Sequence, residues 1–222
     1  MRSRIAGACA AAGRPVDDVT LVAVSKNHPV TTIVEARRLG QLEFGENRVQ
    51  ELAAKATALQ SDPPRWHMIG SVQTNKVRDL LATPGLALVH SLDRDKLADA
   101  LQARLSADAG EPRTLACLLE INASGDQGKH GVLPEAAAVL LAHVQAACPS
   151  LMVRGLMAMG PLAGDPRPTF DRVVRLRDDL RDRSGLALPV LSLGMSGDFE
   201  IAIAAGSTMI RVGTDLFGPR AT

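Results

Sequence analysis

Residues 21–45 read LVAVSKNHPVTTIVEARRLGQLEFG, and this stretch decides the fold. The apolar run Leu21–Ser25 predicts a strand, and the short run Leu42–Gly45 predicts a second one. Between them, residues 31–39 place apolar side chains at the period of a helix. Because the first run is apolar on both of its faces, we expect it to lie in a parallel sheet covered by helices. The stretch therefore predicts a strand-helix-strand unit.

The same alternation continues along the chain. The predicted strands are Leu21–Ser25, Leu42–Gly45, Trp66–Gly70, Leu88–Ser91, Leu115–Ile121, Val153–Met157, Val190–Leu193 and Met209–Val212. The predicted helical segments between them are residues 31–39, 47–60, 73–82, 93–107, 134–147, 168–184 and 198–205. Strands in strict alternation with helices favour closure into a barrel, with an open doubly wound sheet as the alternative. We predict an α/β fold, a (β/α)8 TIM-type barrel with an extra Ala-rich N-terminal helix, formed by residues 1–222 as a single domain.

Composition and charge exclude several classes of protein. Hydrophobic residues make up 46% of the chain and aromatic residues only 2%, so the core must be aliphatic. A net charge of +1 provides no broad basic field for nucleic acid or an anionic membrane, so an anion must be bound at a local site. We recognise no membrane span or signal peptide. The cysteines are three in number and far apart, which argues against a disulfide framework or a zinc site and favours the cytoplasm.

Lys26 directly follows the first predicted strand. In this fold the functional site forms where the strands end, and the period of two places Lys26 on the same strand face as Val22 and Val24. A lysine at the mouth of an apolar barrel is partly desolvated, which favours the free amine and Schiff-base chemistry with a carbonyl. The alternative interpretation is an ordinary strand-end lysine that reaches solvent.

Two glycine turns with hydroxyl side chains follow the last two predicted strands. Gly194-Met195-Ser196-Gly197-Asp198 leads into a helix, and Gly213-Thr214 follows the final strand. Backbone N–H groups in such turns bind phosphate, and the loops after strands seven and eight of a barrel are a frequent phosphate site. The alternative is a tight turn with helix capping by Ser196 or Asp198.

Arg211 interrupts the otherwise apolar final strand. A buried charge needs a partner, so the residue predicts a buried ion pair, an interface contact or a contact with a ligand in the barrel mouth. Other familiar sites are absent from the sequence. There is no Walker A, GxGxxG or HExxH motif, the histidines lack metal-ligand spacing, and Asp198 replaces the second glycine of a nucleophile elbow.

Taken together, the motifs resemble the pyridoxal phosphate homeostasis protein family over nearly the whole chain. The matching segments are Val24-Ser25-Lys26, Phe44-Gly45-Glu46-Asn47 with Gln50-Glu51, Trp66–Gly70 with Gln73 and Asn75-Lys76, Ile121-Asn122 leading to Lys129 and Gly131, Gly155-Leu156-Met157, and Leu191–Gly218. The family commonly carries Tyr where Arg48 stands here, so a side-chain role at that position is in doubt.

The resemblance implies a barrel like the N-terminal domain of alanine racemase, with pyridoxal 5′-phosphate (PLP) held as a Schiff base. It implies that the residues holding the cofactor are Lys26 at the aldehyde, Ser196, Gly197, Gly213 and Thr214 at the phosphate, and Arg211 near the pyridine nitrogen. Asn47 is implied to lie near the cofactor, and Met157 and Met195 are candidate pocket walls for which ordinary core packing is the alternative.

Three functions are compatible with these residues. We favour a non-catalytic PLP carrier in vitamin B6 homeostasis, with indirect effects on amino-acid and keto-acid metabolism. A weak PLP-dependent amino-acid racemase is the runner-up, although racemisation of the alanine racemase type needs a tyrosine opposite the lysine and the chain contains none. We also expect it to lack the second domain that completes such racemase sites. A Schiff-base aldolase or a sugar-phosphate isomerase on the same fold is the third.

The expected partners follow from the favoured function. They are PLP and PLP-dependent apoenzymes, without nucleic acid or membrane, and the chain is expected to be a monomer. Lys76 and Lys129 are candidate secondary lysines for handling the cofactor, against the commoner role of solvated surface residues.

Overall fold

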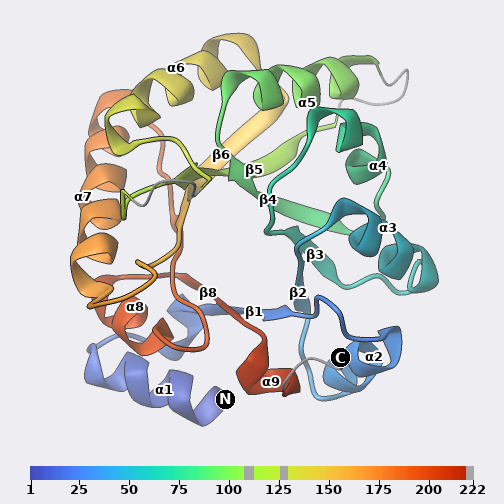
Figure 1. Cartoon of the computed structure of the whole chain (residues 1–222), viewed down its shortest axis with the longest axis vertical. Helices are drawn as coiled ribbons and strands as arrows, with labels where there is room; N and C mark the ends of the chain where they lie inside the picture. The colour runs from blue at the N-terminus through green and yellow to red at the C-terminus, as the bar shows by residue number, and fades with distance from the viewer. Residues whose placement is uncertain (108–112, 126–129, 219–222) are drawn as a thin grey trace.

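Eight parallel strands close into a barrel in the computed structural model, which describes residues 1–107, 113–125 and 130–218. The strands follow one another around the barrel in chain order (Figure 1). Closure is made by β1 (Thr20–Val24) and β8 (Met209–Val212), which pair in parallel with Thr20 opposite Met209 and Ala23 opposite Val212. This pairing confirms the predicted barrel and excludes the open sheet.

The predicted elements are found in the predicted order. The remaining strands are β2 (Glu43–Glu46), β3 (Arg65–Met68), β4 (Leu86–Leu92), β5 (Leu115–Ile121), β6 (Leu151–Ala158) and β7 (Val190–Ser192). The helices are α1 (Arg2–Ala11), α2 (Val30–Arg38), α3 (Val49–Ala58), α4 (Val77–Leu81), α5 (Asp95–Ala107), α6 (Ala137–Ala147), α7 (Arg167–Ser184), α8 (Phe199–Ala205) and α9 (Thr214–Phe217). Short 3-10 turns lie at Val16–Asp18, Thr74–Lys76 and Pro134–Ala136.

Helices surround the strands on the outside, and the extra N-terminal helix is confirmed (Figure 1). Ile5 and Cys9 of α1 are buried in an apolar cluster with Phe199 and Ile203 of α8. Arg4 adds a cation–π contact, with its guanidinium 4.7 Å from the centre of the Phe199 ring. Helix α1 therefore covers the outer side of the last strand–helix unit.

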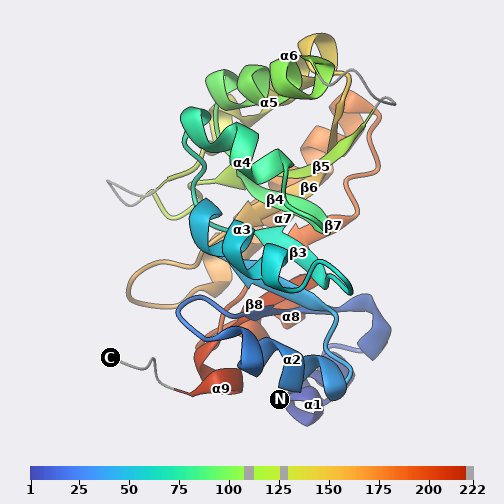
Figure 2. The same cartoon turned by 90° about the vertical axis from the view of Figure 1, so that its right-hand side faces the viewer.

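The short helix α9 was not predicted. It has four residues, too few for a periodic pattern to be recognised, and the sequence suggested only a glycine turn at this position. Figure 2 shows α9 at the same end of the molecule as α1 and α2. Leu216 and Phe217 of α9 line a pocket together with Leu21 and Ala23 of β1.

The interior of the barrel is small and mixed in character. Its apolar cluster consists of Val22, Leu88, Leu118, Met157 and Met209. Polar residues are also buried there; they include His67, His90, Glu120, Ser192 and Arg211. Buried polar groups need partners, so the hydrogen bonds of these residues define how the site is built. Within the described residues, no helix is both long and apolar enough to cross a membrane.

Candidate functional site

A pocket of about 290 Å³ lies at the C-terminal ends of the strands. All eight residues predicted to hold the cofactor line it: Lys26, Asn47, Met195, Ser196, Gly197, Arg211, Gly213 and Thr214. Val24, Ile69, Met157 and Met159 complete the lining. Ile69 and Met159 were not predicted, and both add apolar wall. The fold thus brings together residues from β1 and from the loops that follow β7 and β8.

Lys26 lies where the period of two placed it. Val22 is buried inside the barrel, while Val24 and the half-buried Lys26 line the pocket on the same face of the chain. The next residue, Asn27, has a left-handed backbone with a φ of 64°, so the chain turns sharply after the lysine. The direction of Lys26 therefore depends on what fixes the residues on either side of it.

Two carboxylates and a buried lysine fix those residues. The Lys55 ammonium donates to the Ser25 carbonyl at 2.7 Å and to Oε1 of Glu46 and of Glu51, each also at 2.7 Å. Glu46 accepts a second hydrogen bond from the Ser25 hydroxyl at 2.6 Å, and Glu51 accepts one from the backbone N–H of Asn27 at 2.6 Å. We call Glu46, Glu51 and Lys55 the lysine clamp, because they bind the backbone before and after Lys26.

The electrostatics of the lysine clamp differ between its two carboxylates. Burial raises the pKa of Glu46 above its ordinary value, although Lys55 and Ser25 oppose the shift. Burial also acts on Glu51, but the hydrogen bonds from Lys55 and Asn27 outweigh it and lower the pKa of that carboxyl. Glu46 is fully buried and Lys55 is only 6% exposed, so loss of the ammonium would leave an uncompensated charge in the interior.

The conformation of the loop after β7 is fixed by hydrogen bonds and by close packing at Gly194. Gly194 has a φ of +92°, and a Cβ atom there would lie 2.6 Å from the Cβ of Ala202 in α8. The backbone N–H of Met195 donates to Oδ1 of Asp198 at 2.6 Å, and the N–H of Arg211 donates to the Gly194 carbonyl at 3.0 Å. Asp198 is the N-cap residue of α8, but its side chain makes no capping hydrogen bond within the described residues. The carboxylate instead shapes the loop that carries Ser196 and Gly197.

The second glycine turn begins α9. Gly213 lies against β1, where an added Cβ would be 3.1 Å from the carbonyl oxygen of Val24. Its carbonyl accepts hydrogen bonds from Leu216 at 2.9 Å and Phe217 at 3.0 Å. Thr214, the first residue of α9, is exposed beside the pocket. Both glycine turns therefore line the same pocket.

Arg211 is held at the back of the pocket and is only 5% exposed. Its Nη1 donates to the carbonyl and hydroxyl oxygens of Ser192 at 2.6 and 2.7 Å, and Nη2 donates to the Ala158 carbonyl at 3.1 Å. Burial lowers the pKa of Arg211 to about 10, so the guanidinium remains charged at neutral pH. These hydrogen bonds use three of its five N–H groups, and the other two have no acceptor among the described residues. Arg211 makes no direct ion pair in the described part of the chain. The buried ion pair, one of the three interpretations of its position in the sequence, is therefore not found there.

Asn47 lies at the rim, between two pockets. Its backbone carbonyl approaches Gly70 so closely that a Cβ there would be 2.2 Å away, which explains the glycine after β3. Asn47 also lines a neighbouring pocket of about 650 Å³ that contains Arg48 and Lys76. Neither Arg48 nor Lys76 lines the pocket of Lys26, and Lys129 lies outside the described residues. Met195 is 40% exposed at the mouth, whereas Met157 is buried.

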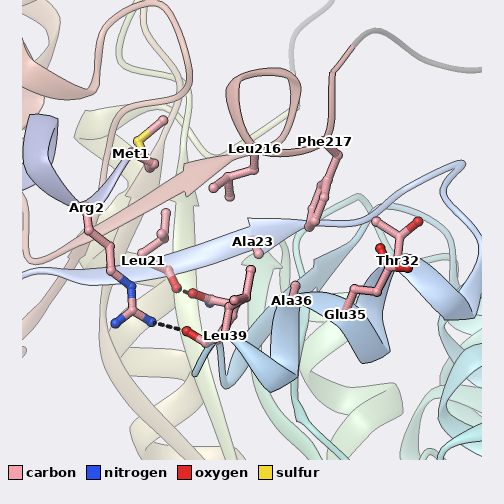
Figure 3. A pocket seen from close by; sticks show the side chains of 11 residues that line it. Met1, Arg2, Leu21, Ala23, Thr32, Glu35, Ala36, Leu39, Leu216 and Phe217 are labelled. Atoms are coloured by element: carbon pink, nitrogen blue, oxygen red, sulfur yellow. Dashed lines mark hydrogen bonds between the residues drawn. The ribbon is translucent and has the colours of Figure 1, made fainter.

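A larger pocket of about 700 Å³ lies elsewhere, on the outer face of β1 (Figure 3). Its walls come from α1, α2 and α9, and Leu21 and Ala23 form the strand side. Arg2 is anchored there by a hydrogen bond from Nη2 to the Leu39 carbonyl at 3.2 Å. Its described lining contains no lysine.

The site contains residues whose roles were missed in the sequence. Glu46 and Glu51 were noted only as part of a motif, and Lys55 was not noted at all. Their spacing carries a signal, since Glu51 and Lys55 are four residues apart on one helix face. Glu120 was also missed; it is 3% exposed inside the barrel, and burial followed by repulsion from Asp93 raises its pKa to about 7.

Comparisons with known proteins agree with this architecture. The family described as "Alanine racemase, N-terminal domain" matches residues 2–221. The chain is 41% identical over 220 residues to the pyridoxal phosphate homeostasis protein of Aquifex aeolicus, covering 98% of this chain and 94% of that protein. It is 40% identical over 216 residues to the protein of the same name from Mus musculus, covering 93% and 78%. The chain belongs to the pyridoxal phosphate homeostasis protein family.

A solved structure supports the assignment. PipY of Synechococcus elongatus PCC7942, determined with PLP bound, superposes with a TM-score of 0.82 at 34% sequence identity. The match covers 96% of this chain and 100% of that one.

Proposed function

We propose that this chain binds PLP as a Schiff base on Lys26 and acts in intracellular PLP homeostasis. The observation that carries the proposal is that Lys26, Arg211 and the two glycine turns line one pocket. The names of the relatives and the PLP-bound structure of PipY point to the same cofactor. As part of the proposal, residues 1–222 act as a single domain, as a monomer, in the cytoplasm.

The residues of the pocket fit PLP. A lysine amine suits the aldehyde, and the turns at Ser196–Gly197 and Gly213–Thr214 offer backbone N–H groups and hydroxyls to the phosphate. The volume of about 290 Å³ lies just below the roughly 300–1,000 Å³ of typical small-molecule pockets, which suits a compact ligand. When bound, PLP supplies an aldehyde that condenses with amines and a ring that withdraws electrons.

The pocket favours holding the cofactor over turnover. Arg211 is a fixed cation whose remaining N–H groups suit an unprotonated ring nitrogen, and this weakens the electron-withdrawing power of the ring. Lys26 and Arg211 are the only ionisable residues in the described lining, so a second base for racemisation is missing there. The absence of tyrosine from all 222 residues supports the same view. PLP-dependent apoenzymes are the proposed recipients of the cofactor.

Ligand titration tests the cofactor. After PLP is added to the purified chain and the unbound cofactor is removed, the wild type should retain a near-visible absorbance that is shifted from that of free PLP, and Lys26→Ala should not. Lys76→Ala is the matched control, since Lys76 lines the neighbouring pocket, and it should behave as the wild type. Tight binding of sugar phosphates without PLP binding would favour the aldolase or isomerase alternative.

Isotope exchange tests turnover. The PLP-loaded chain in deuterated water should exchange the α-proton of amino acids no faster than free PLP does. Exchange well above the free cofactor that is lost in Lys26→Ala would replace the carrier with the racemase.

A further inference from the structure

A continuous line of hydrogen bonds crosses the interior of the barrel and ends at Arg211. Oε2 of Glu43 lies 2.7 Å from Nε2 of His67, and Nδ1 of His67 lies 2.8 Å from Nε2 of His90. Nδ1 of His90 lies 3.0 Å from the Ser192 hydroxyl, which is 2.7 Å from Nη1 of Arg211. The five residues come from β2, β3, β4, β7 and β8, in that order.

The line connects the two ends of the barrel. Glu43 is the first residue of β2 and is paired with the exposed Arg65, the first residue of β3, at 2.7 Å. Arg211 lies near the end of β8 and lines the cofactor pocket. The residues between are inside the protein, with exposures of 2% for His67 and 0% for His90 and Ser192. Water therefore does not compete for these hydrogen bonds.

With both imidazole rings neutral, the direction of every hydrogen bond follows from the two ends of the line. An ionised Glu43 only accepts, so a neutral His67 carries its proton on Nε2 and accepts at Nδ1. A neutral His90 must then donate from Nε2 and accept at Nδ1. The Ser192 hydroxyl therefore donates to His90 and presents only lone pairs to Arg211, which can only donate. With both rings neutral, no other assignment gives each link a donor and an acceptor.

The charges around the line support this assignment. Burial, with the guanidinium of Arg211 acting in the same direction, lowers the pKa of His90 well below its ordinary value, so this ring is neutral. Burial acts to raise the pKa of Glu43, but the hydrogen bond from Nε2 of His67 and the ion pair with Arg65 outweigh it, so the pKa of this carboxyl is lowered and it stays ionised. A cation thus lies at one end of the line and an anion at the other.

We propose that Glu43, His67, His90 and Ser192 form a positioning relay for Arg211. In this relay the Ser192 hydroxyl donates its proton to His90, so its oxygen can only accept from the Arg211 guanidinium. The orientation of the guanidinium is thereby fixed, and with it the direction of its remaining N–H groups. Glu43, at the opposite end of the barrel, determines which nitrogen of each histidine carries the proton, because its carboxylate can only accept a hydrogen bond. The effect on bound PLP rests on the proposed function, whereas the proton positions do not.

The proton positions are tested without any ligand. Two-bond proton–nitrogen correlation spectra of the ligand-free chain at neutral pH, assigned with His67→Asn and His90→Asn, should show both rings neutral and protonated at Nε2. A ring protonated at Nδ1, or on both nitrogens, would overturn the relay.

The effect on the cofactor is tested at Ser192. Ser192→Ala should weaken PLP binding by about tenfold and shift its near-visible absorbance, because Arg211 loses a hydrogen bond made by its charged group. Ser192→Thr retains the hydroxyl and should restore both properties, and His90→Leu should resemble Ser192→Ala. Thermal unfolding confirms that each variant is folded, and His143→Leu on the surface serves as the control.

Two failures are distinguishable. If the wild type binds PLP at Lys26 and Ser192→Ala has the same affinity and spectrum, the relay is wrong and the proposed function stands. If the wild type does not bind PLP while both rings are protonated at Nε2, the proposed function is wrong and the proton assignment stands.

Discussion

The carboxylate of Glu51 accepts a hydrogen bond at 2.6 Å from the backbone N–H of Asn27, the residue that follows Lys26. The same carboxylate accepts another from Lys55, which also binds the carbonyl of Ser25. The backbone on both sides of Lys26 is thus tied to one helix, α3. The direction in which the Lys26 side chain points therefore depends on the lysine clamp as well as on β1.

Replacing Lys55 with methionine tests the lysine clamp. Lys55→Met leaves the carboxylate of Glu46 buried without its counter-ion, so we expect a loss of about 3–5 kcal/mol in the free energy of unfolding. Urea denaturation measures this, with the exposed Lys96→Met as the control. A loss below about 1 kcal/mol, the range of surface ion pairs, would show that the clamp is unimportant.

The loop after β7 offers a matched pair of glycine variants. Gly194→Ala forces a left-handed alanine and brings its Cβ to 2.6 Å from Ala202, so we expect a loss of roughly 2 kcal/mol and weaker PLP binding. Gly197→Ala adds a Cβ into open space, with nothing within 4 Å, and should be nearly neutral in stability. Equal effects of the two substitutions on thermal unfolding would contradict the role given to Gly194.

The raised pKa of Glu120 should make the free energy of unfolding depend on pH. Its pKa of about 7 in the folded chain exceeds the ordinary 4.5, so between these values the folded form keeps a proton that the unfolded form releases. The contribution of Glu120 to stability is fully present below pH 4.5 and is lost as the pH rises to about 7. The whole change corresponds to about 3 kcal/mol.

The variant Glu120→Gln removes this titration. Relative to the wild type, it should become more stable as the pH rises from 4.5 to about 7, and the difference should then level off. Urea denaturation at several pH values measures the difference, with the exposed Glu135→Gln as the control. Parallel pH profiles for Glu120→Gln and the wild type would rule out a raised pKa.

The sequence predicted the barrel well because alternation is a repeated, local signal. The unit of residues 21–45 already shows the pattern, and pairing of β1 with β8 confirmed the closure. Lys26 could be placed in the pocket for the same reason, since a period of two relates it to Val22 and Val24.

Other features could not be predicted, because they depend on how distant elements meet. Lys55 reaches Glu46 only through the rotation of α3 against β2. His67 and His90 come from different strands and show no shared motif, so their contact depends on the strand register. The roles of the pocket residues toward PLP stay predictions until they are measured.

The most direct test of the account is borohydride reduction of the PLP-loaded chain, followed by peptide mass mapping. The account predicts that the phosphopyridoxyl group is found on the peptide containing Lys26 and that Lys26→Ala remains unlabelled. Labelling that is spread over surface lysines, or that persists in Lys26→Ala, would contradict it.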